Sequence, residues 1–210
     1  MLVALLPVSV FAQQASDSVR SPRNPALRAE LLARERRDQA VRASFTEALR
    51  AGRAPDSLLV ATMTTVDTAN THWLRDVVAR LGWPGRRAVG ADGADAAFVL
   101  AQHADRDTAF QAFVLPLMRR AVLLGDASGQ QVALLTDRLA VARGLPQVYG
   151  TQADVTNGRV VLKPIADSAA VDARRAAMGL PPLRDYLRLM DSVYGRRPES
   201  NRLPRPPHRR

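Results

Sequence analysis

The stretch Gln147–Ile165, which reads QVYGTQADVTNGRVVLKPI, is where the hydrophobic pattern of the chain changes its period. Its two halves are rich in valine, tyrosine and threonine, residue types that are enriched in β-strands. They flank Asn157-Gly158, a dipeptide that strongly favours a two-residue turn between paired strands. The stretch therefore predicts one small β-hairpin near residues 147–165.

Around this stretch, apolar residues recur at helical spacing, and capping residues mark where helices begin. Asn24 before Pro25 and Asp56 are typical of helix starts. The pattern predicts, among other elements, helices over about 25–51, 56–81, 108–124 and 128–143, a glycine-rich loop at 86–93 and a helix capped by Asp167. The fold class that follows is mainly α (α+β), a helical domain of about six helices with one small β-hairpin.

The chain has 210 residues, of which 47% are hydrophobic, and this is enough for one core of ordinary size. We expect a single helical domain with its hairpin over residues 25–195, after a polar linker at 13–24. The sequence contains no cysteine, which excludes disulfides, thiolate metal sites and cysteine nucleophiles. No apolar run reaches 18 residues, so no transmembrane segment is expected.

The first residues have the character of an export signal. Leu2–Phe11 is an uncharged apolar run, and Val10-Phe11-Ala12 places small or apolar residues where a signal peptidase reads them. We expect a signal peptide over residues 1–12, cleaved after Ala12, and a periplasmic or extracellular location. The alternative is that these residues form a first element of the core.

The net charge of +10 is carried almost entirely by arginine. Residues 196–210 hold six arginines and one glutamate among four prolines, a composition that predicts a disordered basic tail. Such a tail can bind anionic surfaces weakly, or it can be a solvated end without a partner. Aromatic residues that would stack on bases are missing from it, so no nucleic-acid partner is expected.

Polar residues interrupt the apolar stripes of two predicted helices. Asp67 and Asn70 fall inside or beside the stripe of the second helix, and Asp137 and Arg138 flank the stripe of helix 128–143. A buried carboxylate without a partner costs about 1 to 3 kcal/mol or more, so partners are expected. Arg138 is a candidate partner for Asp67, because a guanidinium fork matches a carboxylate.

Two further groups of polar residues are candidates for a site. His103 ends its predicted helix just before Asp105, which could orient its ring. Gln147, Tyr149, Thr151 and Gln152 surround a glycine at the start of the predicted hairpin, where a ligand or another backbone can approach closely.

Several short segments form a recognisable series along the chain. They are Gly82-Trp83-Pro84, Gln102-His103-Ala104-Asp105, Asp137-Arg138, Gly144–Gln152, Pro164-Ile165, Asp172–Arg175 and Gly179-Leu180. In this order they resemble a bacterial domain-of-unknown-function family, number 6624, and the match would cover about Leu58 to Tyr186. The family has no established activity, so the resemblance implies a domain identity and no mechanism.

Two functions are compatible with these residues. The first is a binding or interaction module for an unknown small-molecule or polymer ligand, with Asn70, Asp137, Gln147, Tyr149, Thr151 and Gln152 at the junction of the helices and the hairpin. The second is a hydrolase-type enzyme with His103 as general acid or base, supported by Asp67, Asp105 and Arg138. A third reading is that these groups only satisfy one another and fix the hairpin against the helices.

Neither a metal nor a cofactor is predicted. A zinc site would need His72, His103 and a carboxylate, and the sequence holds no His-x-x-x-His or His-Glu-x-x-His spacing. Gly90-Ala91-Asp92-Gly93 follows no convincing strand and has no lysine partner, so it is not a phosphate loop or a dinucleotide fingerprint. Serine nucleophiles are unpromising, because no Gly-x-Ser-x-Gly elbow is present.

Overall fold

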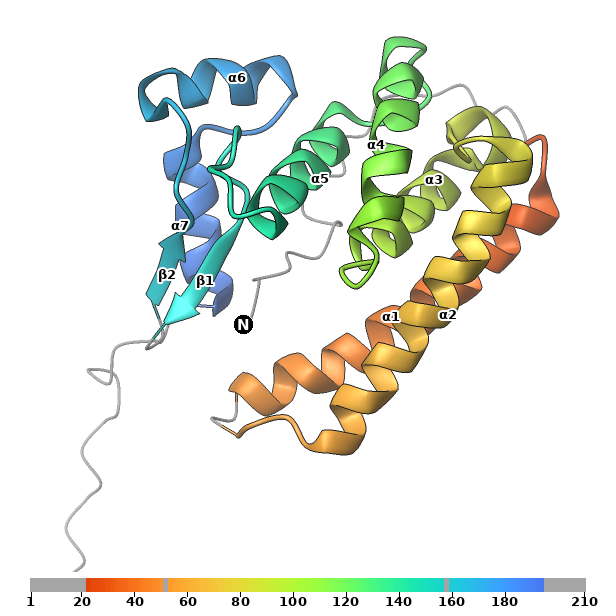
Figure 1. Cartoon of the computed structure of the whole chain (residues 1–210), viewed down its shortest axis with the longest axis horizontal. Helices are drawn as coiled ribbons and strands as arrows, with labels where there is room; N and C mark the ends of the chain where they lie inside the picture. The colour runs from red at the N-terminus through yellow and green to blue at the C-terminus, as the bar shows by residue number, and fades with distance from the viewer. Residues whose placement is uncertain (1–21, 51–52, 157–158, 195–210) are drawn as a thin grey trace, which may run out of the picture.

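The computed structural model describes residues 22–50, 53–156 and 159–194. Within these residues, seven α-helices and one two-stranded antiparallel hairpin follow one another along the chain (Figure 1). The predicted fold class, mainly α with a small β-hairpin, is confirmed. The expected signal peptide at 1–12, nearly all of the expected linker and the basic tail at 196–210 lie outside the described residues.

The first two helices, α1 (Pro25–Arg50) and α2 (Ser57–Leu81), pack side by side (Figure 1). Both begin at residues that cap them. Asn24 accepts a hydrogen bond from the Leu27 amide at 2.9 Å, and Asp56 accepts one from the Leu59 amide at 2.7 Å. Because these contacts are local in sequence, the helix starts could be predicted from the sequence.

The central helix is α3 (Arg86–Gln102), which contacts α1, α2, α4 and α5 and is buried without interruption from Ala96 to its end. It begins earlier than predicted, because residues 86–93, expected as a loop, are helical except for a break at Gly90, whose φ is 77°. Asp126 stabilises this start by accepting hydrogen bonds from the amides of Arg86 at 3.0 Å and Arg87 at 2.6 Å. These contacts come from a residue distant in sequence, so local patterns did not reveal them.

Two further helices, α4 (Thr108–Leu123) and α5 (Gly129–Ala142), complete the main core. The side chain of Asp107 caps α4 by accepting from the Phe110 amide at 2.9 Å. The largest apolar side chains that are fully buried between these helices are Leu31, Leu74, Phe98, Leu100, Phe110, Met118 and Leu135.

The C-terminal part forms a second, smaller cluster. It consists of β1 (Ala153–Thr156), β2 (Arg159–Leu162), a short 3-10 turn (Ser168–Ala170), α6 (Val171–Ala177) and α7 (Leu183–Tyr194). The hairpin pairs Ala153 with Leu162 and Thr156 with Arg159, and α7 packs against β2. Tyr186 and Met190 of α7 are buried there against partly buried apolar side chains of both strands.

Three details of this part differ from the sequence prediction. The strands are shorter than the stretch 147–165, and Gln147 and Ile165 form only an isolated bridge. Asp167 makes no side-chain cap, because its own φ of 46° turns the backbone away before the 3-10 turn. The Asn157-Gly158 turn lies outside the described residues. Among the residues that are described, no helix is long and apolar enough to cross a membrane.

Candidate functional site

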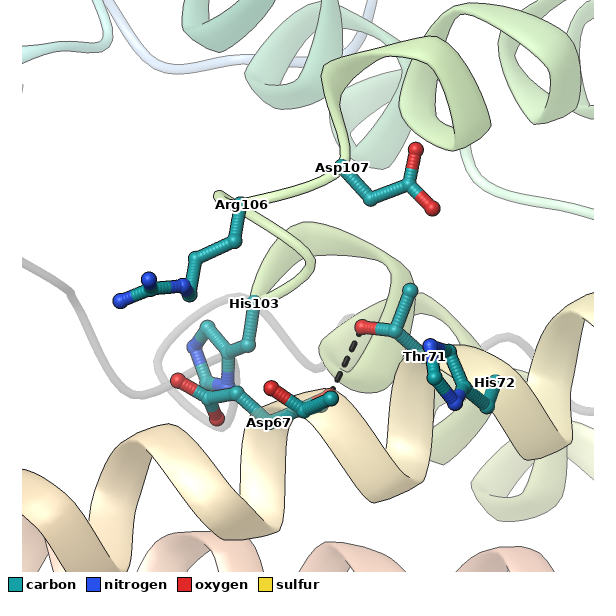
Figure 2. A pocket seen from close by; sticks show the side chains of 7 residues that line it. Asp67, Thr71, His72, His103, Arg106 and Asp107 are labelled. Carbon is teal, nitrogen blue, oxygen red and sulfur yellow. Dashed lines mark hydrogen bonds between the residues drawn. The ribbon is translucent and has the colours of Figure 1, made fainter.

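A pocket of about 220 Å³ lies between α2 and the loop that joins α3 to α4 (Figure 2). Its walls are polar, and they bring together residues about 35 positions apart in the sequence. The residues that line it are Asp67, Thr68, Thr71 and His72 of α2, with His103, Arg106 and Asp107 of the loop.

His103 caps the C-terminal end of α3 and is 4% exposed. Its Nδ1 atom lies 2.9 Å from both carboxylate oxygens of Asp38, a fully buried residue of α1. Burial lowers the pKa of His103, and the opposing effect of Asp38 does not restore it, so the ring is neutral at pH 7. A neutral ring beside a carboxylate carries its proton on Nδ1, which leaves the lone pair of Nε2 available to accept.

Asp38 is held as an anion in this buried place. Burial acts to raise the pKa of Asp38, but the hydrogen bonds and charges of His103 and Arg42 outweigh that effect and lower it. Arg42 donates to it at 2.7 Å and Gln39 at 2.8 Å. The carboxylate is therefore ionised and fully satisfied, which lets it fix the orientation and tautomer of the imidazole.

The guanidinium of Arg42 connects Asp38 to the pocket wall. Nη1 of Arg42 bonds to Asp38, while Nη2 lies 2.9 and 3.0 Å from the two oxygens of Asp67. Burial raises the pKa of Asp67 to about 6, although Arg42 acts to lower it. Asp67 can therefore exchange a proton near neutral pH, beside a histidine whose Nε2 is free to accept one.

Asp38, Asp67 and His103 could also be considered as metal ligands, because one ligand atom from each lies within 4.8 Å of the others. The guanidinium of Arg42, however, already bridges the two carboxylates and supplies the positive charge that a metal would bring. Figure 2 shows His72, the second histidine that a zinc site would need, on the other side of the pocket from His103. The donor set fits a guanidinium-bridged cluster better than a metal centre.

The structure brings together some of the predicted catalytic residues and separates others. Asp67 and His103 line one pocket, as a site would require. Arg138 is paired with Asp105 at 2.7 Å, so the predicted pair of Arg138 with Asp67 is wrong. The prediction that Asp105 or Asp67 orients His103 is also wrong, because Asp38 of α1 takes that role.

Asn70 does not lie at the junction of the helices and the hairpin, where it was predicted. Its side-chain oxygen accepts from Arg34 of α1 at 3.2 Å. The Arg34 guanidinium also stacks on the ring of Trp73, with its carbon 4.3 Å from the ring centroid. Asn70 thus belongs to the α1–α2 contact, while the hairpin lies at the far end of the molecule (Figure 1).

The predicted binding residues at the helix and hairpin junction lie together, and they bond to the backbone and to each other. The Asp137 carboxylate accepts from the amides of Val148 at 2.7 Å, Tyr149 at 3.0 Å and Thr151 at 2.9 Å, and from the Thr151 hydroxyl at 2.9 Å. It is fully buried. These amides are consequently not available for strand pairing, which explains why the strands are shorter than predicted.

Gln147 and Gln152 continue the same network. The Gln147 amide group donates to the backbone oxygens of Gln152 at 2.9 Å and Lys163 at 2.8 Å, and it accepts from the Gln152 amide at 2.7 Å. Tyr149 is half-buried, and its side chain is the member of the group that makes no hydrogen bond to another described residue. A ligand at this junction stays a prediction.

Asp38 and Arg42 are the site residues that sequence reasoning missed. The signal that could have found them is helical spacing, because Asp38 comes seven residues after Leu31 and so shares its buried face. Arg42 follows one turn later, at the spacing of a salt bridge within a helix. Their partners on α2 and α3 could not be found in this way.

The fold and the pocket define a mainly helical protein with a cluster of ionisable side chains at one wall of a small pocket. In this cluster Arg42 bridges Asp38 and Asp67, and Asp38 bonds to His103. The chain belongs to a family of unknown function (DUF6624), whose family model matches residues 25–198. The resemblance noted in the sequence is confirmed, and the match extends further in both directions than the stretch 58–186. No curated protein and no solved structure matches the chain.

Proposed function

We propose that this protein is a hydrolase-type enzyme in which His103 is the general base that activates water in the pocket. The observation that carries the proposal is the buried Asp38–His103 pair, whose ring forms part of the wall of a pocket that also contains Asp67. A histidine that is oriented by a buried carboxylate and is neutral at pH 7 is a competent base.

The roles of the three residues follow from their contacts. His103 takes a proton from water on Nε2, while the water oxygen attacks the substrate. Asp38 holds the ring and stabilises the imidazolium that forms, because its carboxylate faces Nδ1–H. Asp67, whose pKa is about 6, gives a proton to the leaving group. His103 then returns its proton to bulk water or to Asp67.

A screen of chromogenic ester, amide, glycoside and phosphoester substrates tests this proposal on the full chain. The expected rate falls above about pH 6, where Asp67 loses its proton, and it falls again at low pH, where His103 becomes protonated. His103→Gln is expected to lower kcat by about 100-fold to 10,000-fold with little change in KM. Full activity in this variant would exclude His103 as the base.

Asp38→Asn tests whether the Asp38 carboxylate orients the His103 ring or only fills a buried position. It preserves the size of the side chain but removes the charge that fixes the imidazole, so kcat falls and the acidic limb of the pH profile shifts. Asp95→Asn is the matched control, because Asp95 is a half-buried carboxylate of α3 outside the pocket, bonded to Gln131 at 2.7 Å. Equal losses in the two variants would indicate a structural effect only.

The binding module predicted from the sequence is the weaker proposal for this chain. Its polar residues Asp137, Gln147, Thr151 and Gln152 are buried and bonded within the protein, which leaves Tyr149 as the group that a ligand could reach. Ligand-induced changes in Tyr149 fluorescence or amide signals at this junction, without catalysis at His103, would favour it over the enzyme.

We also propose that the protein is exported, and the apolar run Leu2–Phe11 with Ala12 after it supports this. Expression of the complete sequence with fractionation of the cells tests the proposal. The mature chain is expected in the exported fraction with Gln13 as its first residue. Recovery of the intact chain from the cytoplasm would contradict export, and weak binding to anionic vesicles that is lost without residues 196–210 would support a role for the tail.

A further inference from the structure

The carboxylate oxygens on the pocket wall are already engaged. Both oxygens of Asp67 accept from Arg42, and the Thr71 hydroxyl donates to the backbone oxygen of Asp67 at 2.7 Å. One oxygen of Asp107 accepts from the Phe110 amide and the other from Arg75. Beside these carboxylates, Nε2 of His103 is an open acceptor on the wall.

The pocket wall also carries side chains that can donate. The side chains of Thr68, His72 and Arg106 line the pocket and are exposed, and none of the three makes a hydrogen bond or ion pair with another described residue. The neighbouring arginines differ in this respect, because Arg75 is paired with Asp107 and Arg138 with Asp105. Among the described arginines around the pocket, Arg106 alone keeps its guanidinium available.

The loop that carries Arg106 is fixed at its ends. The Asp107 amide donates to the backbone oxygen of Ala104 at 2.9 Å, and the Asp107 side chain caps α4. The preceding Asp105 is tied to Arg138. Figure 2 shows the Arg106 side chain extending from this loop on the same side of the pocket as the His103 ring. Arg106 is thus presented to the pocket by backbone that does not need to rearrange.

We propose that the substrate carries a phosphoryl group, which Arg106 binds together with Thr68 and His72 beside His103. The unpaired guanidinium of Arg106 can pair with phosphoryl oxygens through two parallel hydrogen bonds, and the Thr68 hydroxyl and the His72 ring can donate to further oxygens. Tetrahedral oxygens can meet donors from several directions, whereas the two oxygens of a carboxylate lie in one plane. A pocket of about 220 Å³ limits the substrate to a small molecule.

This inference rests on the proposed function and names its substrate class. The reaction is hydrolysis of a phosphate monoester. A water oxygen forms the new bond to phosphorus, its proton passes to Nε2 of His103, and the bond to the ester oxygen breaks. That oxygen takes a proton from Asp67, and Arg106 stabilises the charge on the phosphoryl oxygens.

Titration of inorganic phosphate into the full chain tests the inference, with the imidazole signals of His72 and His103 followed by NMR. We expect saturable shifts of both signals, with a Kd that rises about tenfold in Arg106→Gln. Arg37→Gln is the matched control, because Arg37 is an exposed arginine of α1 that does not line the pocket. Its Kd is expected to equal that of the unmodified chain.

Three results would overturn the inference: no saturable shift with phosphate, equal affinity in the Arg106→Gln protein, or acetate binding as tightly as phosphate. The experiment needs no turnover, so it separates the two proposals. Phosphate binding that depends on Arg106, without hydrolysis of any phosphate ester, supports the phosphoryl site and contradicts the catalytic role of His103. Hydrolysis that depends on His103 but not on Arg106 supports the catalytic role of His103 and contradicts the phosphoryl site at Arg106.

Discussion

Asp38 carries more of the site than any other single residue. It is fully buried, and it accepts hydrogen bonds from His103, Arg42 and Gln39. Removing one partner of a buried ionic cluster leaves the others desolvated without compensation. The residue that orients His103 is therefore also one on which the packing of α1 against α3 depends.

Asp38→Ala is accordingly expected to lower the free energy of unfolding by about 3 kcal/mol. Arg42 retains Asp67 as a partner, which holds the loss to the lower part of the range for buried pairs. Urea denaturation measures the change. Asp92→Ala, which removes the exposed ion pair with Arg28, is the control and is expected to cost much less. Similar losses in both variants would contradict the argument.

The raised pKa of Asp67 predicts a dependence of stability on pH. Asp67 binds its proton more tightly in the folded chain, with a pKa of about 6, than at its ordinary value of 3.8. Its contribution to stability is therefore fully present below about pH 4 and is lost as the pH rises through 6.

Asp67→Asn isolates this contribution, because the amide has no proton to lose. The stability of the unmodified protein relative to this variant is expected to fall by about 1 to 3 kcal/mol between pH 4 and pH 7. Urea denaturation of both proteins at a series of pH values measures it. A difference that stays constant over this range would show that Asp67 titrates alike in the folded and unfolded chains.

At the scale of residues, the sequence could identify candidates but not their partners. Asp67 was found because it interrupts an apolar stripe and His103 because it ends a helix just before Asp105, and they do share a pocket. The choice between Arg138 and Arg42 as the partner of Asp67 depends on which helix packs beside α2. That is a property of the tertiary structure, and hydrophobic spacing within one helix does not contain it.

At the scale of elements, α5 holds the segment that leads into the hairpin. Asp137 of α5 accepts from the amides of Val148, Tyr149 and Thr151 and from the Thr151 hydroxyl, and Arg175 of α6 donates to the backbone oxygen of Tyr149 at 2.6 Å. The segment is therefore fixed by polar side chains of neighbouring helices rather than by strand pairing. Residues 147–152 contain few large apolar side chains, so the hydrogen bonds to them decide the conformation of this segment.

Asp137→Ala is expected to destabilise the protein by about 3 kcal/mol or more, because three amides, one of them fully buried, lose their acceptor. Hydrogen exchange at the amides of Val148, Tyr149 and Thr151 is expected to accelerate. Thr136→Ala is the matched control on the same helix, since the Thr136 hydroxyl bonds mainly to its own helix at Val132. Unchanged protection of the three amides in Asp137→Ala would refute the anchoring role.

Elements that local chemistry defines were predicted well, and elements that distant residues define were not. The starts of α1, α2 and α4 follow from Asn24, Asp56 and Asp107, each bonded three residues along the chain. The early start of α3 depends instead on Asp126. The hairpin was predicted from its β-rich halves, but its length is set by Asp137, which withdraws three amides from pairing.

At the scale of the molecule, the two apolar clusters differ greatly in size. The main core joins α1 to α5 around α3, whereas the second apolar cluster groups the buried Tyr186 and Met190 with partly buried side chains of the hairpin and α7. Polar contacts join the two parts, such as those of Asp137 and the bond from Gln130 to the Gly179 oxygen at 2.5 Å. Polar contacts lose less on exposure to water than apolar contacts do.

The smaller cluster is therefore expected to open before the main core unfolds. Native-state hydrogen exchange in increasing urea measures the opening free energy of each amide. Amides of Phe98 and Leu100 in α3 should exchange only through global unfolding. Amides of the hairpin and α7 should exchange through a partial opening that has a lower free energy and a smaller dependence on urea.

Because the pocket belongs to the main core, phosphate should raise the opening free energy in α3 and leave that of α7 unchanged. A single common free energy for both clusters would mean that the polar contacts around Asp137 couple them into one cooperative unit.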